Sequence, residues 1–331
     1  MLLRLFTILT TLLIFAPLAN AESFGGSGLQ KLTVINPVDK RPLEAVAFYP
    51  SQIATDNIKI GPYRVKASSG APIGEGRYPL ILLSHGTMGS MWGHHDLATF
   101  LARNGYIVVT VTHAGDSFQD SSRVGAVSSI YGRPMQISAA LTAALADPVL
   151  ASHLDKNRIG FVGFSAGGTT GLILAGAKPD LSRFEDYCAK RPDDQNVCEA
   201  RGKVRLDRPD LAPIADPRIS AFVLMAPVSL VFSPDGLKSV NAPMQVYVGE
   251  QDEELSPNAN ALTLAAELPK VQLQIIEKAG HFTFLAPCST ELAGAAPVLC
   301  TDNPGLDRTV LHKRINAEIA AFFDQTLESV H

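Results

Sequence analysis

The stretch that most constrains this chain runs from residue 158 to residue 177, RIGFVGFSAGGTTGLILAGA. Residues 159–164 are an apolar run rich in β-branched and aromatic side chains, which predicts a buried strand. The run ends in Gly-Phe-Ser-Ala-Gly, a match to the G-x-S-x-G pattern around Ser165, and a helical run of small residues follows at once. A strand, a sharp turn and a helix form the context in which this pattern marks a nucleophilic serine. Ser165 would then stand at a helix N-terminus, where negative charge is favoured.

Strand and helix patterns alternate along most of the chain. Strand patterns occupy residues 32–35, 43–49, 78–84, 106–112, 159–164, 219–225, 244–248 and 271–276, and helical patterns occupy residues 93–104, 134–147, 258–268 and 308–328. Because such alternation forms a mostly parallel sheet covered on both faces, we expect an α/β fold in one large domain. The Gly- and Ser-rich residues 23–28 are expected to form a flexible lead-in, and residues 51–77 a surface excursion.

Residues 178–217 interrupt this alternation. The segment is polar, rich in proline and charge, and leaves the sheet beside the strand that carries Ser165. Because active sites of open α/β sheets lie at the carboxyl ends of their strands, we expect a cap or lid. A surface decoration is the alternative.

Residues 1–21 have the pattern of a secretory signal peptide. Arg4 supplies a positive start, residues 5–15 are apolar, and Ala-Asn-Ala, ending at Ala21, is a small-residue cleavage site. A transmembrane anchor is the alternative, but the apolar run is too short to span a bilayer. The residue directly after the cleavage site is Glu22 rather than a cysteine, so no lipid anchor is expected. We expect a mature chain of residues 22–331 that is soluble and exported, either periplasmic or secreted.

The four cysteines fall in two close pairs, Cys188 with Cys198 and Cys288 with Cys300. Of the three possible connectivities, local pairing is the simplest in an oxidising compartment. A zinc site is the alternative, although the chain has no C-x-x-C motif. The net charge of −4, without a cluster of Lys or Arg, gives no indication of nucleic-acid binding.

An activated serine needs a general base, and the base needs an orienting carboxylate. Behind a G-x-S-x-G turn, the acid and then the histidine follow the serine in the chain. His281 follows the last strand in a Gly-bounded turn and is the expected base, whereas His312, inside the last helix, is expected to face solvent. Asp252, after the strand at 244–248, is the expected acid. Three neighbouring carboxylates are alternatives for this role: Glu250, Glu253 and Glu254.

Two backbone N–H groups are expected to stabilise the oxyanion. One belongs to Ala166, directly after the serine, and the other to Thr87, in the loop after the strand at 78–84. Apolar residues in or after loops at the strand ends are candidates for a substrate pocket, with ordinary packing as the alternative: Met88, Met91, Trp92 and Phe118. His85 is expected to shape its loop. The adjacent His94 and His95 point different ways on a helix, so no metal site is expected.

Four segments in this order, HGTMGS, GFSAGG, VGEQDEELSP and AGHFTFLAPC, resemble the motifs of the α/β-hydrolase superfamily. More narrowly, the chain is similar to its secreted dienelactone-hydrolase-like branch, and to platelet-activating-factor acetylhydrolases and bacterial cutinases, over most of residues 32–325. The resemblance implies an α/β-hydrolase fold and a Ser-His-Asp esterase, with Ser165, Asp252 and His281 at the matching positions. True dienelactone hydrolases carry a cysteine nucleophile, so lactone specificity is not implied. The strand at 219–225 is followed by Ala-Pro rather than an acid, unlike the platelet-activating-factor type.

We therefore expect an exported serine carboxylic-ester hydrolase that acts on a small-molecule ester and needs no cofactor. Two alternatives stay open: hydrolysis of amides or peptides by the same triad, and a binding protein that kept the fold without turnover. The sequence carries no prediction of the oligomeric state.

Overall fold

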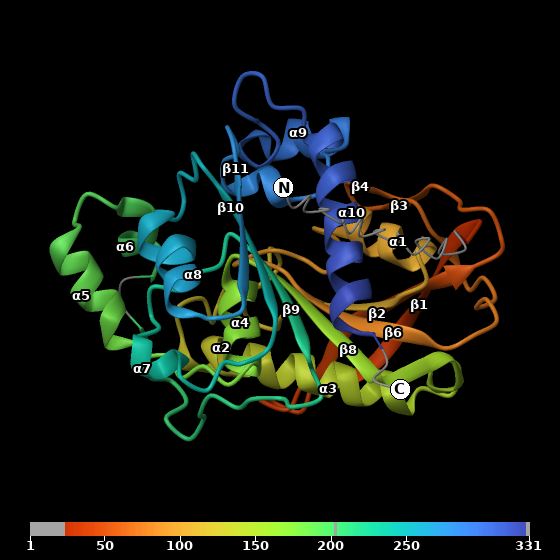
Figure 1. The fold of residues 1–331 in the computed structure, drawn as a ribbon, viewed down its shortest axis with the longest axis horizontal. Coiled ribbons are helices and arrows are strands. Elements are labelled where there is room, and N and C mark those ends of the chain that lie inside the picture. Colours follow the sequence, from red (N-terminus) through yellow and green to blue (C-terminus); the bar gives the residue numbers. More distant parts are fainter. Residues whose placement is uncertain (1–23, 202–203, 329–331) are drawn as a thin grey trace, which may run out of the picture.

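The computed structural model describes residues 24–201 and 204–328; the predicted signal peptide lies outside these ranges. Its centre is a nine-stranded sheet of order β11-β10-β9-β8-β6-β7-β2-β1-β5 (Figure 1). The strands are β1 (Gly26–Ile35), β2 (Pro42–Ser51), β5 (Ser68–Ser69), β6 (Tyr78–Ser84), β7 (Ile107–Val111), β8 (Leu154–Phe164), β9 (Ala221–Met225), β10 (Met244–Gly249) and β11 (Val271–Ile276). The six strands from β11 to β7 in this order run parallel, and β2 pairs antiparallel with both β7 and β1. The predicted, mostly parallel α/β sheet is confirmed.

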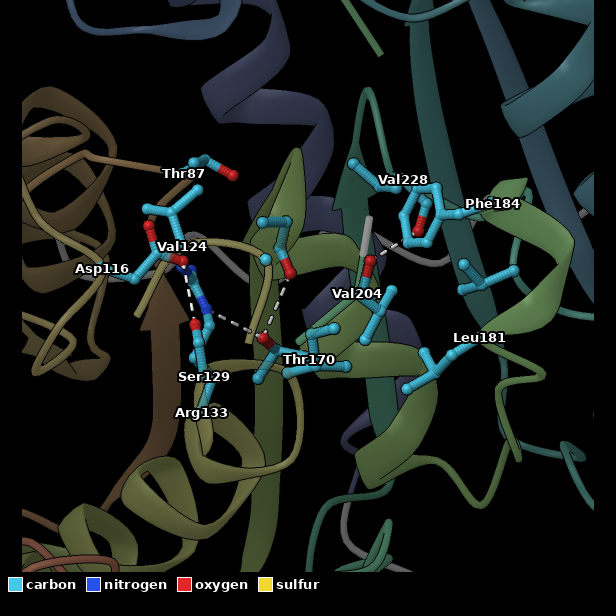
Figure 2. A pocket seen from close by; sticks show the side chains of 15 residues that line it. Thr87, Asp116, Val124, Ser129, Arg133, Thr170, Leu181, Phe184, Val204 and Val228 are labelled. Carbon is cyan, nitrogen blue, oxygen red and sulfur yellow. Dashed lines mark hydrogen bonds and ion pairs between the residues drawn. The ribbon is translucent and has the colours of Figure 1, made fainter. Parts of the chain in front are cut away.

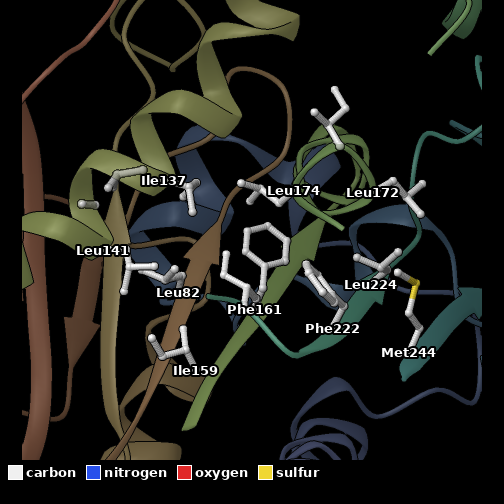
Figure 3. Close-up of a cluster of buried hydrophobic side chains, with 14 of the residues drawn as sticks. Leu82, Ile137, Leu141, Ile159, Phe161, Leu172, Leu174, Phe222, Leu224 and Met244 are labelled. Atoms are coloured by element: carbon white, nitrogen blue, oxygen red, sulfur yellow. The ribbon is translucent and has the colours of Figure 1, made fainter. Parts of the chain in front are cut away.

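Helices cover both faces of the sheet. One hydrophobic cluster lies under α1 (His95–Arg103) and α10 (Arg308–Thr326), and a second under α3 (Gly132–Ala146), α4 (Ala166–Leu174) and α8 (Thr263–Glu267). Neighbouring residues of β8 show the division: Phe161 belongs to the α3/α4 cluster, whereas Val162 belongs to the α1/α10 cluster. Figure 3 shows Phe161 and Phe222 packed under α3 and α4. Strands buried on both faces explain the continuous apolar runs of the sequence.

Several predicted bounds differ from those observed. The strand predicted at residues 32–35 begins at Gly26, so the expectation of a flexible lead-in over residues 23–28 is wrong for its last three residues. The reason is packing: Gly28 lies opposite Tyr49 of β2, and a Cβ at Gly28 would meet the Tyr49 ring at 2.0 Å. The excursion at 51–77 contains a two-stranded hairpin, β3 (Ile58–Ile60) and β4 (Tyr63–Val65), and the edge strand β5. The helix predicted at 258–268 begins as a π-helix, η2 (Asn258–Leu262), before α8.

The insertion at 178–217 leaves the sheet after α4 and returns at β9. It holds α5 (Ser182–Lys190) and α6 (Gln195–Arg201), which lie at one end of the molecule (Figure 1). Sγ of Cys188 lies 2.04 Å from Sγ of Cys198, and the same distance separates those of Cys288 and Cys300, so the predicted pairing is confirmed. Disulfides are typical of proteins in oxidising, extracellular environments. In the described ranges, no helix has both the length and the hydrophobicity to cross a bilayer.

The remaining short helices connect these elements. They are α2 (Val127–Ile130), α7 (Pro234–Leu237), α9 (Thr290–Ala295), and the 3-10 turns η1 (Ala151–His153), η3 (His281–Phe284) and η4 (Pro297–Leu299). Of these, η3 begins with His281 and follows β11, while α9 and η4 lie between Cys288 and Cys300. The parallel strands thus place the loops after β6, β8, β10 and β11 at one edge of the sheet.

Candidate active site

Ser165 occupies a sharp turn between β8 and α4, with φ of 54° and ψ of −116°. The motif requires glycine at positions 163 and 167 for a direct steric reason. A Cβ at Gly163 would lie 2.2 Å from the Gly167 carbonyl oxygen, and a Cβ at Gly167 would lie 2.2 Å from the Ser84 carbonyl oxygen. Neither position therefore admits a side chain. The turn places Ser165 at the N-terminus of α4, near the carboxyl end of β6.

Asp252 and His281 lie together at the same edge of the sheet. Asp252 Oδ2 is 2.8 Å from His281 Nδ1, and both side chains are buried. Asp252 Oδ1 accepts hydrogen bonds from the N–H groups of Glu254 and Leu255, which fix the carboxylate. Since the carboxylate accepts the proton on Nδ1, Nε2 of neutral His281 is left with its lone pair available, as a general base requires.

His281 also lies next to the serine turn. Its ring centroid is 4.9 Å from that of Phe164, the residue before Ser165. Within the described residues, the Ser165 hydroxyl makes no hydrogen bond, to His281 or to another group. Such bonds often tighten only when substrate is bound, so the arrangement is compatible with a serine–histidine pair.

Glu253, one of the alternative acids, contacts the same histidine differently. Its Oε2 accepts a hydrogen bond from the backbone N–H of His281 at 3.2 Å, and its side chain closes over Gly280. Glu250 likewise accepts from a backbone N–H, that of Lys278. Only Asp252 among these carboxylates bonds the imidazole, which supports its choice as the orienting acid.

Thr87 and Ala166 lie on the same side of the site, and both line one cavity. Within the described chain, neither of their backbone N–H groups donates a hydrogen bond to the protein. The N–H of Ala166 is the first in α4, and that of Thr87 comes directly after His85 and Gly86. Two free N–H groups beside a buried serine can stabilise a developing oxyanion.

A buried ion pair, which the sequence analysis did not identify, holds the Thr87 loop. Arg133 Nη1 donates to Asp116 Oδ2 at 2.7 Å, and both side chains are at most 5% exposed. Asp116 Oδ1 accepts from the Met88 N–H at 2.8 Å, and Arg133 also donates to the His85 carbonyl oxygen. The two residues therefore bind the loop on both sides of Thr87. In the sequence, only the position of Asp116 in the loop after β7 could have indicated a role at this edge of the sheet. No sequence pattern marks Arg133.

His85 shapes this loop, as its sequence position predicted. His85 Nδ1 donates to the Gly86 carbonyl oxygen at 2.6 Å, and Nε2 accepts from the N–H of His113 at 3.0 Å. Burial, together with the nearby Arg133 guanidinium, lowers the pKa of His85 to about 3. The ring therefore stays neutral with both nitrogens engaged, and it is not available as a general base.

The expectation that His312 faces solvent is wrong. Its side chain is 8% exposed, and Nδ1 donates to Asp96 Oδ2 at 2.6 Å while Nε2 donates to the Thr283 carbonyl oxygen at 2.8 Å. Two acceptors require both ring nitrogens to carry hydrogen, so the ring is an imidazolium. Burial opposes this charge, but the Asp96 carboxylate and the two hydrogen bonds raise the pKa of His312 above its ordinary value.

Two cavities are lined by the chain neighbours of Ser165: Ala166 lines the first, and Phe164 lines the second. The first, here named the insertion cavity, is lined by core and insertion residues including Thr87, Ala166, Val228, Leu181, Phe184 and Val204. Figure 2 shows Thr87, Asp116 and Val124 on one side of it and Leu181, Phe184 and Val204 on the other. The second, the histidine-loop cavity, is lined by residues including Thr87, Phe118, Phe164, Phe282, Leu292 and Leu299.

The predicted pocket residues separate into two places. Met88 and Phe118 line the histidine-loop cavity, and the two residues are 53% and 64% exposed. Met91 and Trp92 instead line a groove over β1 and β2, where the Trp92 ring packs edge-on against Phe48. Trp92 therefore lies apart from the two cavities at Ser165.

His94 and His95 are both buried and point in different directions. The His94 ring packs against Phe164, and the His95 ring packs against Tyr63. Burial lowers the pKa of His94 to about 4. Within the described part of the chain, no group of three or more His, Cys, Asp or Glu side chains is placed to hold a metal ion.

Comparison with known proteins agrees with this architecture. Residues 80–295 match the family model described as "Alpha/beta hydrolase family". The chain belongs to the alpha/beta hydrolase family. Among solved structures, this α/β hydrolase is similar to a ferulic acid esterase from Streptomyces cinnamoneus, with a TM-score of 0.63 and 18% sequence identity over 94% of this chain and 92% of that one. At this identity the likeness shows the α/β-hydrolase fold. No curated protein matches the sequence closely enough to assign an activity by similarity.

Proposed function

We propose that this α/β hydrolase is a serine esterase that cleaves carboxylic esters through an acyl-enzyme. The observation that carries the proposal is the buried Asp252–His281 pair, at 2.8 Å, beside Ser165 in its strained turn. Ser165 attacks the ester carbonyl while His281 accepts its proton, and Asp252 holds the imidazole. The N–H groups of Thr87 and Ala166 bind the oxyanion.

The second half of the reaction uses the same groups. His281 returns the proton to the departing alcohol, and then activates water to release the acid from Ser165. None of these steps requires a cofactor. The predicted signal peptide and the two disulfides support export, and the contribution of the insertion to a cavity beside Ala166 supports its role as a lid.

A fluorophosphonate probe tests the nucleophile directly. The wild-type protein should be labelled at Ser165, and Ser165→Ala should abolish labelling and lower ester turnover by about a thousandfold or more, because the covalent route is lost. Ser152, exposed on η1, is the matched control, and Ser152→Ala should change neither readout. Near-normal ester turnover by a folded Ser165→Ala variant would contradict the mechanism.

A further inference from the structure

Thr87 lines both cavities beside Ser165, so an ester carbonyl bound at the oxyanion donors would lie where the two cavities meet. The insertion cavity has a volume of about 60 Å³, and the histidine-loop cavity has a volume of about 240 Å³. A substrate that spans the junction would therefore place its two halves in spaces of unequal size.

The insertion cavity offers no free charge to a ligand. Its two ionic side chains, Asp116 and Arg133, bind each other, and Ser129 Oγ donates to the same carboxylate at 3.2 Å. Arg133 Nε donates to Thr170 Oγ1 at 3.3 Å. The rest of the lining is largely aliphatic, with Phe184 from the insertion. An uncharged, apolar group is the complementary occupant.

The position of His281 assigns the two halves of the ester. A general acid must lie beside the departing alcohol oxygen, because it delivers the proton there. Phe282, the next residue, and Phe164, against which the His281 ring packs, both line the histidine-loop cavity. Ala166, at the oxyanion, lines the insertion cavity. The alcohol half therefore belongs in the histidine-loop cavity and the acyl half in the insertion cavity.

We infer that the preferred substrates are esters of a short, uncharged acid with a larger apolar or aromatic alcohol; this inference rests on the esterase function proposed above. The aromatic rings of Phe118, Phe164 and Phe282 line the larger cavity and suit an aromatic alcohol. In the chemical step, the bond from Ser165 Oγ to the acyl carbon forms and the bond to the alcohol oxygen breaks. The alcohol leaves with the proton from His281, and water then releases the short acid.

Two isomeric esters separate the halves. Benzyl acetate carries its ring on the alcohol, whereas methyl phenylacetate carries it on the acid, and both release an unactivated alkyl alcohol. We expect kcat/KM for benzyl acetate to exceed that for methyl phenylacetate by about tenfold or more, since misplaced groups of this size cost at least that in a shaped pocket. An equal or reversed preference in an enzyme that fluorophosphonate labels at Ser165 would overturn this inference alone.

Variants in each cavity test the assignment. Leu292→Trp fills the histidine-loop cavity. It should lower kcat/KM for benzyl acetate by a factor about ten times larger than the factor by which it lowers kcat/KM for methyl acetate. Val298→Trp, on the exposed surface of the same segment, is the control and should not discriminate. Phe184→Ala, which enlarges the insertion cavity, should raise the relative rate with methyl phenylacetate, whereas Glu185→Ala on the same helix should not. If Leu292→Trp acted on methyl phenylacetate and Phe184→Ala on benzyl acetate instead, the assignment of the two cavities would be reversed. A protein without fluorophosphonate labelling or ester turnover would refute the esterase function itself.

Discussion

The positive φ of Ser165 places its backbone where residues with a Cβ seldom lie, at a cost of about 1–3 kcal/mol. Neighbouring backbone groups hold the strained residue on both sides. The Ser165 N–H donates to the Met225 carbonyl oxygen at 2.9 Å, and the Ser165 carbonyl oxygen accepts from the N–H groups of Val228 and Gly168. The backbone of Ser165 and the free N–H of Ala166 are therefore held in place before any substrate binds.

At the same scale, the acidic loop after β10 shows where residue pattern stops being informative. Four carboxylates within five residues have similar local surroundings in sequence, and the pattern favoured Asp252 only by its place after the strand. In the structure, the choice depends on side-chain direction: Asp252 contacts the His281 ring, whereas Glu253 contacts the His281 backbone. That difference arises from the turn geometry and has no signature in composition.

The two neighbouring carboxylates should differ sharply in effect. Asp252→Asn removes the charge that fixes the His281 tautomer, so kcat for ester hydrolysis should fall about a thousandfold or more. Glu253→Gln leaves an amide oxygen that can accept a hydrogen bond from the His281 backbone N–H, so kcat should change little. Steady-state kinetics of the two variants, with circular dichroism to verify folding, make the comparison. A large loss confined to Glu253→Gln would transfer the orienting role to Glu253.

At the scale of elements, η3 is held by contacts to other segments of the chain. Its His281 belongs to the site, its Thr283 carbonyl oxygen accepts from His312 of α10, and Thr283 Oγ1 donates to Asp302. Hydropathy predicted α10, and the bounds of β6 and β11, because these features are local. It could not predict the contact between His312 and Asp96, which are 216 positions apart in the chain.

The His312 imidazolium should give ester hydrolysis an alkaline limb. The groups that face it are Asp96, the Thr283 carbonyl oxygen and the cationic Arg308. Asn316 donates to Asp96 Oδ2, and His94 and His95 also lie near Asp96. The pKa of His312 is raised on folding, so its stabilising contribution is complete below the ordinary histidine pKa and is lost as pH rises through the raised value. Above that pH the ring keeps only one N–H, and the η3 loop that carries His281 loses a hydrogen bond.

The pH profile of kcat tests this support. Asp96→Asn removes the charge that raises the pKa of His312, so the alkaline limb should move to lower pH. His153→Gln, a half-buried histidine just before β8 whose Nδ1 donates to the Gly76 carbonyl oxygen, is the control and should leave the alkaline limb unchanged. An alkaline limb that does not move in active Asp96→Asn would show that η3 works without charged His312.

The Cys288–Cys300 disulfide should affect catalysis as well as stability. It closes a loop of 12 positions that begins seven residues after His281, and such a closure contributes roughly 3 kcal/mol by the chain-entropy model. Cys288 and Leu299 also line the histidine-loop cavity, so the loop shapes the site. Replacing both cysteines with serine should lower the melting temperature and kcat together, while Ser165 still reacts with small fluorophosphonates.

The Cys188–Cys198 bond is a matched control, since it spans 10 positions within the insertion. Replacing both of these cysteines with serine should lower the melting temperature by a similar amount. The fall in kcat for methyl acetate should be smaller than in the Cys288–Cys300 double variant. Thiol titration of the unreduced wild-type protein comes first. Titratable thiols at Cys288 and Cys300, or equal kcat losses in the two double variants, would contradict a specific role for the second disulfide.

Across the whole molecule, the order of motifs along the chain explains why the candidate site residues lie at one edge of the sheet. Thr87, Ser165, Asp252 and His281 each follow a different strand of one parallel set, and the carboxyl ends of parallel strands share an edge. The sequence could therefore predict the gathering of the site without any knowledge of contacts. It could not predict the two cavities, because their walls combine α2, the insertion and the disulfide loop, which no local pattern relates.

The insertion should respond to occupation of the cavity that it helps to line. Leu181, Phe184 and Val204 face the insertion cavity, so an acyl-like chain attached to Ser165 would bury apolar surface against them (Figure 2). Hydrogen exchange of α5 should therefore slow when Ser165 is labelled with a fluorophosphonate whose butyl group on phosphorus occupies the acyl position, and should change little with the methyl analogue. Both probes modify the same atom, so the comparison isolates the chain. Equal exchange of α5 with the two labels would mean that the segment is a fixed wall rather than a lid, and that the acyl half of a substrate does not reach it.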